Sequence, residues 1–167
     1  MNALEALTEM LELQRSYTEM MFKAHNINGY EDIEEKISLA LVDEIGEFNH
    51  ELKPVWVWWK ENPGQVNKDR ILDEYADIVH FCLDSMIANG RDNLVVMATV
   101  LDGVERSESY DTLPKAIKKC CLTIGLDSNT LEIIAGLRKL LGIEWEDVLY
   151  YYKRKNEVNR ERVVNHY

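Results

Sequence analysis

The pattern of apolar and polar positions predicts a chain that is helical almost throughout. Apolar residues recur with the 3.6-residue period of an α-helix, and only three prolines and eight glycines are available to interrupt them. The predicted helices cover residues 3–25, 31–52, about 68–88, 112–126, 131–141 and 144–164. Residues 93–101 fit a helix or a buried strand, with the neighbouring helices favouring a helix, whereas residues 102–110 are predicted to form a polar loop.

Two of these helices carry a pair of acidic residues three positions apart. Glu44 and Glu47 lie on the second helix, and Glu74 and Asp77 lie on the third. Residues with this spacing share one helical face. Both pairs border apolar side chains rather than facing away from them; the apolar stripe of the second helix consists of Leu41, Ile45, Phe48 and Leu52.

Packing the two helices through these faces would bring the four carboxylates into a partly dry space. Like charges there repel one another and resist ionisation, and a divalent cation removes the conflict. Magnesium takes oxygen ligands and shares its positions among carboxylates, waters and substrate phosphates. A single acid pair is most often ordinary helix surface. Two pairs on successive helices, both beside apolar stripes, predict a magnesium site.

The composition indicates which kinds of binding partner and which cellular compartment to expect. The 167 residues, 46% of them hydrophobic, fit one domain spanning residues 1–167. A net charge of −11 argues against binding to nucleic acid polymers or anionic membranes, and no stretch approaches the length of a membrane span. Cys82, Cys120 and Cys121 fit no disulfide or zinc pattern, and the acidic N-terminus is unlike a signal peptide, so a cytoplasmic protein is expected.

The last predicted helix supplies a candidate phosphate-binding face. Lys155, Asn159 and Arg162 follow i, i+4, i+7 spacing, so one face presents an ammonium, an amide and a planar guanidinium. This combination suits a polyphosphate. The alternative is a solvated basic face, because runs of charge usually lie on the surface.

Further residues could bind a nucleobase. Trp56, Trp58 and Trp59 could stack on a base, but a place in the core or in a dimer contact is equally consistent with the sequence. Gln14 and His80 are polar residues on otherwise apolar helices. Such residues are most often buried and structural, yet an amide and an imidazole can also read a base edge.

Four segments of the chain carry a family resemblance. They are E-I-G-E at residues 44–47, K-P-V-W-V-W-W-K at 53–60, E-Y-A-D-I-V-H-F at 74–81 and Y-x-x-K-N-x-x-N-x-x-R at 152–162. Together they resemble the dimeric all-α dUTPases, which belong with the MazG-like enzymes to the all-α nucleotide pyrophosphohydrolases. The resemblance extends from Gln14 to Tyr167. The acid motif alone indicates the superfamily, and the tryptophan and C-terminal segments point to the dUTPase branch.

The resemblance implies an all-α helical bundle with a four-helix metal-site core. It also implies a homodimer that uses Mg²⁺-activated water to hydrolyse dUTP, and dUDP as well, to dUMP. By motif, Glu44, Glu47, Glu74 and Asp77 would hold the metal, and Glu47 would also orient or deprotonate the water. The substrate would be bound by Gln14, His80 and Trp59 around uracil, by Asn159 near the nucleoside, by Lys155 and Arg162 at the phosphates, and by Lys60, Tyr152 and Asn156.

The resemblance leaves two points open. The family often has glycine before its final tyrosine, whereas this chain ends in Asn165-His166-Tyr167. The residues also do not say how the base is held. A related pyrophosphohydrolase acting on dCTP or on other nucleoside triphosphates is therefore an alternative.

Two rival interpretations come from other classes of protein. The spacings Glu47-x-x-His50 and Asp77-x-x-His80 approximate those of a di-iron carboxylate bundle. Such a bundle also needs a glutamate from each of two further helices, and no clear candidates stand out. The other rival is a non-catalytic helical protein that binds a partner through its tryptophans.

Overall fold

The computed structural model describes residues 1–165, in which every regular element is helical. This confirms the all-α class predicted from the sequence. The α-helices are α1 (Ala3–His25), α2 (Glu34–Glu51), α3 (Lys53–Trp56), α4 (Lys68–Ala88), α5 (Leu94–Arg106), α6 (Leu113–Gly125), α7 (Leu131–Leu141) and α8 (Trp145–Val164), with the 3₁₀ turns η1 (Tyr30–Asp32) and η2 (Glu108–Tyr110). None of these described helices is both long and apolar enough to cross a membrane.

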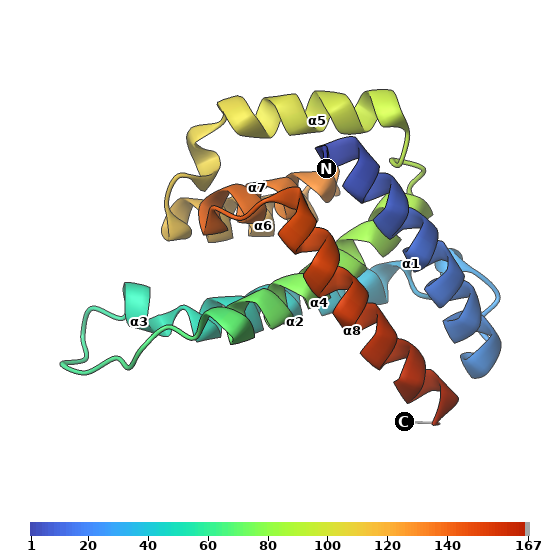
Figure 1. Cartoon of the computed structure of the whole chain (residues 1–167), viewed down its shortest axis with the longest axis horizontal. Helices are drawn as coiled ribbons and strands as arrows, with labels where there is room; N and C mark the ends of the chain where they lie inside the picture. The colour runs from blue at the N-terminus through green and yellow to red at the C-terminus, as the bar shows by residue number, and fades with distance from the viewer. Residues whose placement is uncertain (166–167) are drawn as a thin grey trace.

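Helices α2 and α4 form the axis of the molecule. They pack side by side and are joined at one end by α3 and an extended loop (Figure 1). Helices α1 and α8 pack against each other and against α4, while α7 packs against α4, α5 and α6. This arrangement places the acid-bearing stretches of α2 and α4 beside α1 and α8.

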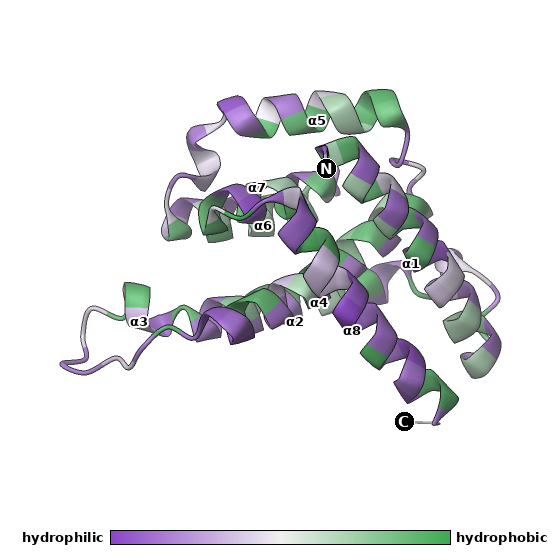
Figure 2. Cartoon of the chain, viewed as in Figure 1, coloured by the Kyte–Doolittle hydropathy of each residue, from purple (hydrophilic) through white to green (hydrophobic). Residues whose placement is uncertain are grey.

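Helix α4 is central because apolar residues cover most of its circumference. Tyr75, Ile78, Cys82 and Leu83 are all buried, and the helix packs against α1, α2, α7 and α8. The Tyr75 hydroxyl donates a 2.7 Å hydrogen bond to the carbonyl of Ile134 on α7. Figure 2 shows the contrast with α8, whose C-terminal half is mostly hydrophilic. Helix α8 therefore buries one face and leaves polar side chains for other contacts.

Capping side chains fix the starts of α1, α4 and α8 within one residue of the predicted positions. Asn2 and Glu5 form a reciprocal capping box at the start of α1. At the start of α4, the Asn67 side chain accepts hydrogen bonds from the backbone N–H groups of Asp69 and Arg70. A second capping box opens α8.

Two predicted boundaries were wrong. Helix α2 begins at residue 34 rather than 31, because Asp32 accepts hydrogen bonds from the backbone and side chain of Asn28 and lies in the separate turn η1. The polar loop predicted over residues 102–110 is wrong in its first half, since α5 continues to Arg106. Val104 is buried there, and Arg106 forms an ion pair with Asp102 one turn earlier. Residues 93–101 belong to this helix and not to a strand.

The close approach of η2 to α7 depends on a glycine. Tyr110 is buried against Gly136, where an added Cβ would lie 2.1 Å from Cε1 of the tyrosine ring. No larger residue fits there unless the ring moves. Gly103, inside α5, has open space where its Cβ would be. Gly136 and Gly103 thus differ in what an added side chain would meet.

Candidate active site

A cavity of about 710 Å³ lies among α1, α2, α4 and α8. This volume is typical of small-molecule sites. The cavity has an acidic end, a cationic wall and an apolar end. It brings together nine of the residues predicted from the sequence: Gln14, Glu44, Glu47, Glu74, Asp77, His80, Lys155, Asn159 and Arg162.

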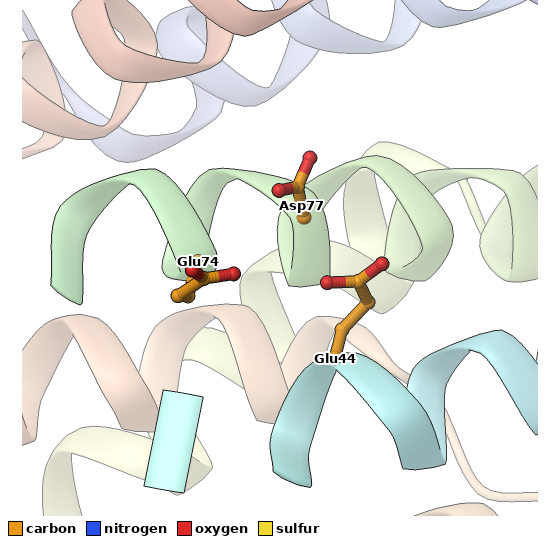
Figure 3. A group of neighbouring side chains, drawn as sticks. All are labelled: Glu44, Glu74 and Asp77. Carbon is orange, nitrogen blue, oxygen red and sulfur yellow. The ribbon is translucent and has the colours of Figure 1, made fainter. Parts of the chain in front are cut away.

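Three carboxylates converge at the acidic end. One oxygen each from Glu44 on α2 and from Glu74 and Asp77 on α4 lie within 4.8 Å of one another. Figure 3 shows Glu44 reaching from α2 toward α4, which carries Glu74 and Asp77. Glu47 lines the same cavity but is more exposed, and it lies outside this group of three.

Burial makes this concentration of negative charge unfavourable. The pKa of Glu44 is raised to about 7, first by burial and then by the charges of Asp77, Glu47 and Glu74. The pKa values of Glu74 and Asp77 are also raised, again chiefly by burial. Near neutral pH, Glu44 is therefore partly protonated. A cation bound among these oxygens would release that proton.

Helix α8 brings positive charge to the wall beside the acids. Nζ of Lys155 lies 2.5 Å from Oδ2 of Asp77, and this contact opposes the rise in the Asp77 pKa that burial causes. Asn159 and Arg162 also line the cavity, with NH1 of Arg162 3.4 Å from Oδ1 of Asn159. The i, i+4, i+7 face noted in the sequence therefore borders the cavity.

Gln14 is held inside the cavity wall by three neighbours. Its Oε1 accepts hydrogen bonds from Nδ1 of His80 (2.8 Å) and from the hydroxyl of Tyr152 (2.9 Å), while its Nε2 donates to Oγ1 of Thr18 (3.3 Å). Burial, aided by the charge of Lys155, lowers the pKa of His80 to about 3. The ring is therefore neutral, and its Nδ1–H is the donor. Gln14 is fully buried, and its carbonyl oxygen already accepts two hydrogen bonds.

These hydrogen bonds belong to a longer chain that connects α8 through α1 to α4. Every donor in it points the same way, because the guanidinium at one end can only donate and the carboxylate at the other can only accept. In order, the groups are Arg160 Nε, Asn156, Tyr152, Gln14, Thr18 and Asp84 Oδ1. Tyr152 and Asn156, predicted to bind substrate, are buried and do not line the cavity. They instead support residues that do.

The apolar end of the cavity was not predicted from the sequence. Asp84 and Thr18 lie there among the apolar side chains of Met21, Phe22, Ile27, Ile33 and Phe81. A signal existed for both polar residues. Thr18 follows Gln14 by one helical turn, and Asp84 follows Asp77 by two, so each shares a face with a residue that was singled out.

The acid cluster, the cationic wall and the apolar end together suit a metal-assisted reaction on a phosphate-bearing ligand. The family model described as dUTPase matches residues 6–167. The chain belongs to the dUTPase family. It is therefore a dUTP diphosphatase, one of the nucleotide pyrophosphohydrolase enzymes. No curated protein compared with the chain matches it.

This dUTPase carries its tryptophans away from the cavity. Nε1 of Trp56 donates a 3.0 Å hydrogen bond to the carbonyl of Asn49, and Trp59 packs against both Trp56 and Trp58. Trp58 and Trp59 are 87% and 57% exposed. The segment after α3 that holds them lies at the far end of the α2–α4 pair (Figure 1), and neither Trp59 nor Lys60 lines the cavity of its own chain.

The two histidines of the predicted di-iron spacing, His50 and His80, do not complete such a site within the described residues. His80 bonds to Gln14, and Nδ1 of His50 lies 3.0 Å from Nζ of Lys53. Within residues 1–165, the group able to hold a metal consists of carboxylates alone. Oxygen donors favour a hard cation over the histidine-rich iron site. Residues 166 and 167, where the closing segment departs from the family, lie outside the described part of the chain.

Proposed function

We propose that this dUTPase uses Mg²⁺ to hydrolyse dUTP to dUMP and pyrophosphate, and that it also accepts dUDP. The observation that carries the proposal is the convergence of Glu44, Glu74 and Asp77 within 4.8 Å at one end of a nucleotide-sized cavity. Glu47 borders the same space. Magnesium suits such a site because it shares its ligand positions between carboxylates and substrate phosphates.

Three features support the fit to a divalent cation. The donors are all oxygens, which hard divalent ions prefer. The pKa of Glu44 is raised to about 7, which reflects a repulsion between carboxylates that a cation relieves. The ammonium of Lys155 already lies against Asp77, so the carboxylates of the cluster attract positive charge.

The residues of the cavity have different roles in the proposed reaction. Bound magnesium would supply the positive charge that neutralises the phosphates and activates water. Glu47, the most exposed of the four acids, accepts the proton of the attacking water as general base. Lys155 and Arg162 bind phosphate oxygens from the α8 wall, and Asn159 contacts the nucleoside.

The uracil lies toward the apolar end in this proposal. Gln14 and His80 form part of the wall there, and the neutral ring of His80 adds no charge to it. Tyr152 and Asn156 act as positioning residues, because their hydrogen bonds hold Gln14 in place. Removing either should lower activity through the geometry of the wall rather than through lost contact with substrate.

The test is pyrophosphate release from dUTP with and without Mg²⁺, with phosphate release from dUDP measured in parallel. Glu47→Gln should lower kcat at least about 1,000-fold while leaving the Kd for dUMP and the free energy of unfolding nearly unchanged. The matched control is Glu35→Gln, which changes an exposed glutamate on the same helix that lines neither the cavity nor the hollow beside Val42, and it should keep full activity. Turnover that survives Glu47→Gln or needs no divalent ion would contradict the proposal.

We infer in addition that two copies associate through the outer face of α2 and the tryptophan segment. Leu39 and Val42 are 71% and 55% exposed on α2, beside a hollow of about 750 Å³. With the exposed tryptophans they form apolar surface that a second copy would cover. Association would also let Trp59 and Lys60 of one copy reach the cavity of the other, which explains why neither lines its own.

The oligomeric state tests this association. Wild-type protein should have the mass of a dimer in size-exclusion chromatography with light scattering, and Val42→Asp should shift it to a monomer. Val95→Asp is the matched control, because Val95 is an exposed valine on the distant helix α5. A monomeric wild type, or a dimer lost in Val95→Asp and kept in Val42→Asp, would contradict this interface.

The three cysteine thiols support the cytoplasmic location that we propose. All three cysteines are free, with Cys82 and Cys120 buried and Cys121 exposed. Free thiols persist in reducing surroundings. We therefore place the enzyme in the cytoplasm.

A further inference from the structure

Asp84 is a buried carboxyl group in the cavity wall that the proposed hydrolysis does not use. It is 9% exposed and lies on α4 at the apolar end. Burial raises its pKa, and hydrogen bonds from the neutral groups of Thr18, Tyr30 and Gln14 oppose that rise. A carboxylate placed among apolar side chains is unfavourable unless it has partners. The chain therefore devotes several donors to this one group.

The donors of Asp84 gather on one of its two oxygens. Oδ1 accepts hydrogen bonds from Thr18 (2.7 Å) and from Tyr30 (2.9 Å). The bond from Thr18 is the last in the directed chain that begins at the guanidinium of Arg160. Hydrogen bonds in series polarise one another, and here each one favours negative charge on Asp84. The carboxylate is thus presented as a fixed acceptor.

The position of Asp84 matches the far edge of a bound base. It follows Asp77 by seven residues, which is two turns of α4 and about 10 Å along the helix axis. That length is similar to the distance between a phosphate of a nucleotide and the distal edge of its pyrimidine. A nucleotide whose phosphates lie at the acid cluster would therefore point its base toward Asp84. Phe81, between the two acids, provides apolar surface for the ring.

We propose that Asp84 selects the base, by accepting a hydrogen bond from the ring N3–H of uracil. Cytosine presents an unprotonated nitrogen acceptor at this position, so it meets the carboxylate with repulsion instead of a hydrogen bond. A site whose buried polar group is left unpaired rejects the wrong ligand strongly. The inference rests on the proposed function and adds to it the residue that separates dUTP from dCTP.

The experiment compares kcat/KM for dUTP and dCTP in the wild type and in Asp84→Asn, with saturating Mg²⁺. The amide is the same size but can offer an N–H to the ring nitrogen of cytosine. The ratio of kcat/KM for dUTP to that for dCTP should fall about 10- to 100-fold. Tyr30→Phe is the matched control, since it removes a donor to the same oxygen and keeps the carboxylate, and it should change the ratio less than about 3-fold.

A measurement on the wild type covers the case in which Asp84→Asn does not fold. The 3-deaza analogue of dUTP has a C–H in place of the N3–H, and its kcat/KM should be at least about 10-fold lower than that of dUTP. Equal use of this analogue, or equal loss of dUTP and dCTP hydrolysis in folded Asp84→Asn, would overturn selection by Asp84. A wild type that hydrolyses neither nucleotide would overturn the proposed function, and this inference with it.

Discussion

Nζ of Lys155 lies 2.5 Å from Oδ2 of Asp77, so the last helix provides a counter-charge for the acid cluster. The same ammonium is proposed to bind phosphate, and it competes with a metal ion for Asp77. Lys155→Met should therefore bind Mg²⁺ about 3- to 10-fold more tightly in the absence of nucleotide. The same variant should lose about 100-fold in kcat/KM for dUTP. Isothermal titration and steady-state kinetics measure the two effects.

The control for this prediction is Lys153→Met on the same helix. Lys153 forms its ion pair with Glu9, and it does not line the cavity. Both the Mg²⁺ affinity and kcat/KM should stay near the wild-type values. Weaker metal binding by Lys155→Met would show that the lysine assists the cation rather than competing with it.

Glu44 should make the stability of the metal-free protein depend on pH. Its pKa is about 7 in the folded state and about 4.5 when unfolded, so the folded state resists its ionisation. Its contribution to stability is present below pH 4.5 and is lost as the pH rises to 7 and above. At pH 8 the free energy of unfolding of Glu44→Gln should exceed that of the wild type by about 1 kcal/mol. The difference is smaller than the full pKa shift implies, because Glu44 is partly exposed. At pH 4.5 the two proteins should be almost equally stable.

Urea unfolding in EDTA across this pH range measures the difference. Asp43→Asn, which alters an exposed neighbour, should show no such trend. Added Mg²⁺ should restore stability to the wild type and bind more tightly as the pH rises from 6 to 8. A difference between Glu44→Gln and wild type that shrinks as the pH rises would contradict the assignment.

Gln14 should matter for stability as much as for activity. Gln14→Leu leaves the donors of His80 and Tyr152 without an acceptor inside the wall, and it should cost about 3 kcal/mol of unfolding free energy. Tyr152→Phe removes one donor and leaves Gln14 with its other bonds, so it should cost only about 1 kcal/mol. Chemical denaturation gives both values. Gln65→Leu, at an exposed loop position, should have almost no effect.

Gly136 and Gly103 should respond in opposite directions to substitution by alanine. Gly136→Ala places a Cβ 2.1 Å from the Tyr110 ring and should destabilise the protein by about 3 kcal/mol. Gly103→Ala meets open space and should stabilise it by up to about 1 kcal/mol, because alanine favours the helix. Thermal unfolding distinguishes the two. A stabilised Gly136→Ala would mean that η2 moves away from α7 without cost.

Features that depend only on the spacing of residues along one helix could be predicted from the sequence. The acid pairs of α2 and α4 could be found because residues three apart share a face wherever the helix lies. The cationic face of α8 follows from the same rule. Even so, only packing could show that Glu44, Glu74 and Asp77 come within 4.8 Å of one another, and that Glu47 lies beside Glu74 but outside this group of three.

Features that depend on contacts between distant helices escaped prediction. In the sequence, Asp84 is one acid among many on the helices. Its role becomes visible only in the structure, where Thr18 and Tyr30 donate hydrogen bonds to it. The C-terminal end of α5 was predicted to be a loop because charged residues outnumber apolar ones there. In the structure, the buried side chain of Val104 packs this end of the helix against the core. The distance of Trp59 from its own cavity likewise follows from the length of the α2–α4 pair and not from any local pattern.

The acid cluster comes from α2 and α4, which only the short helix α3 and a loop separate in sequence, whereas its lysine comes from the last helix. Without the ammonium of Lys155, the repulsion among the three carboxylates would be offset less from within the chain and more by dissolved ions. One lysine of the last helix thus helps the centre of the molecule to tolerate a medium free of divalent salts. Loss of that one ammonium should therefore make the folded state depend more strongly on magnesium.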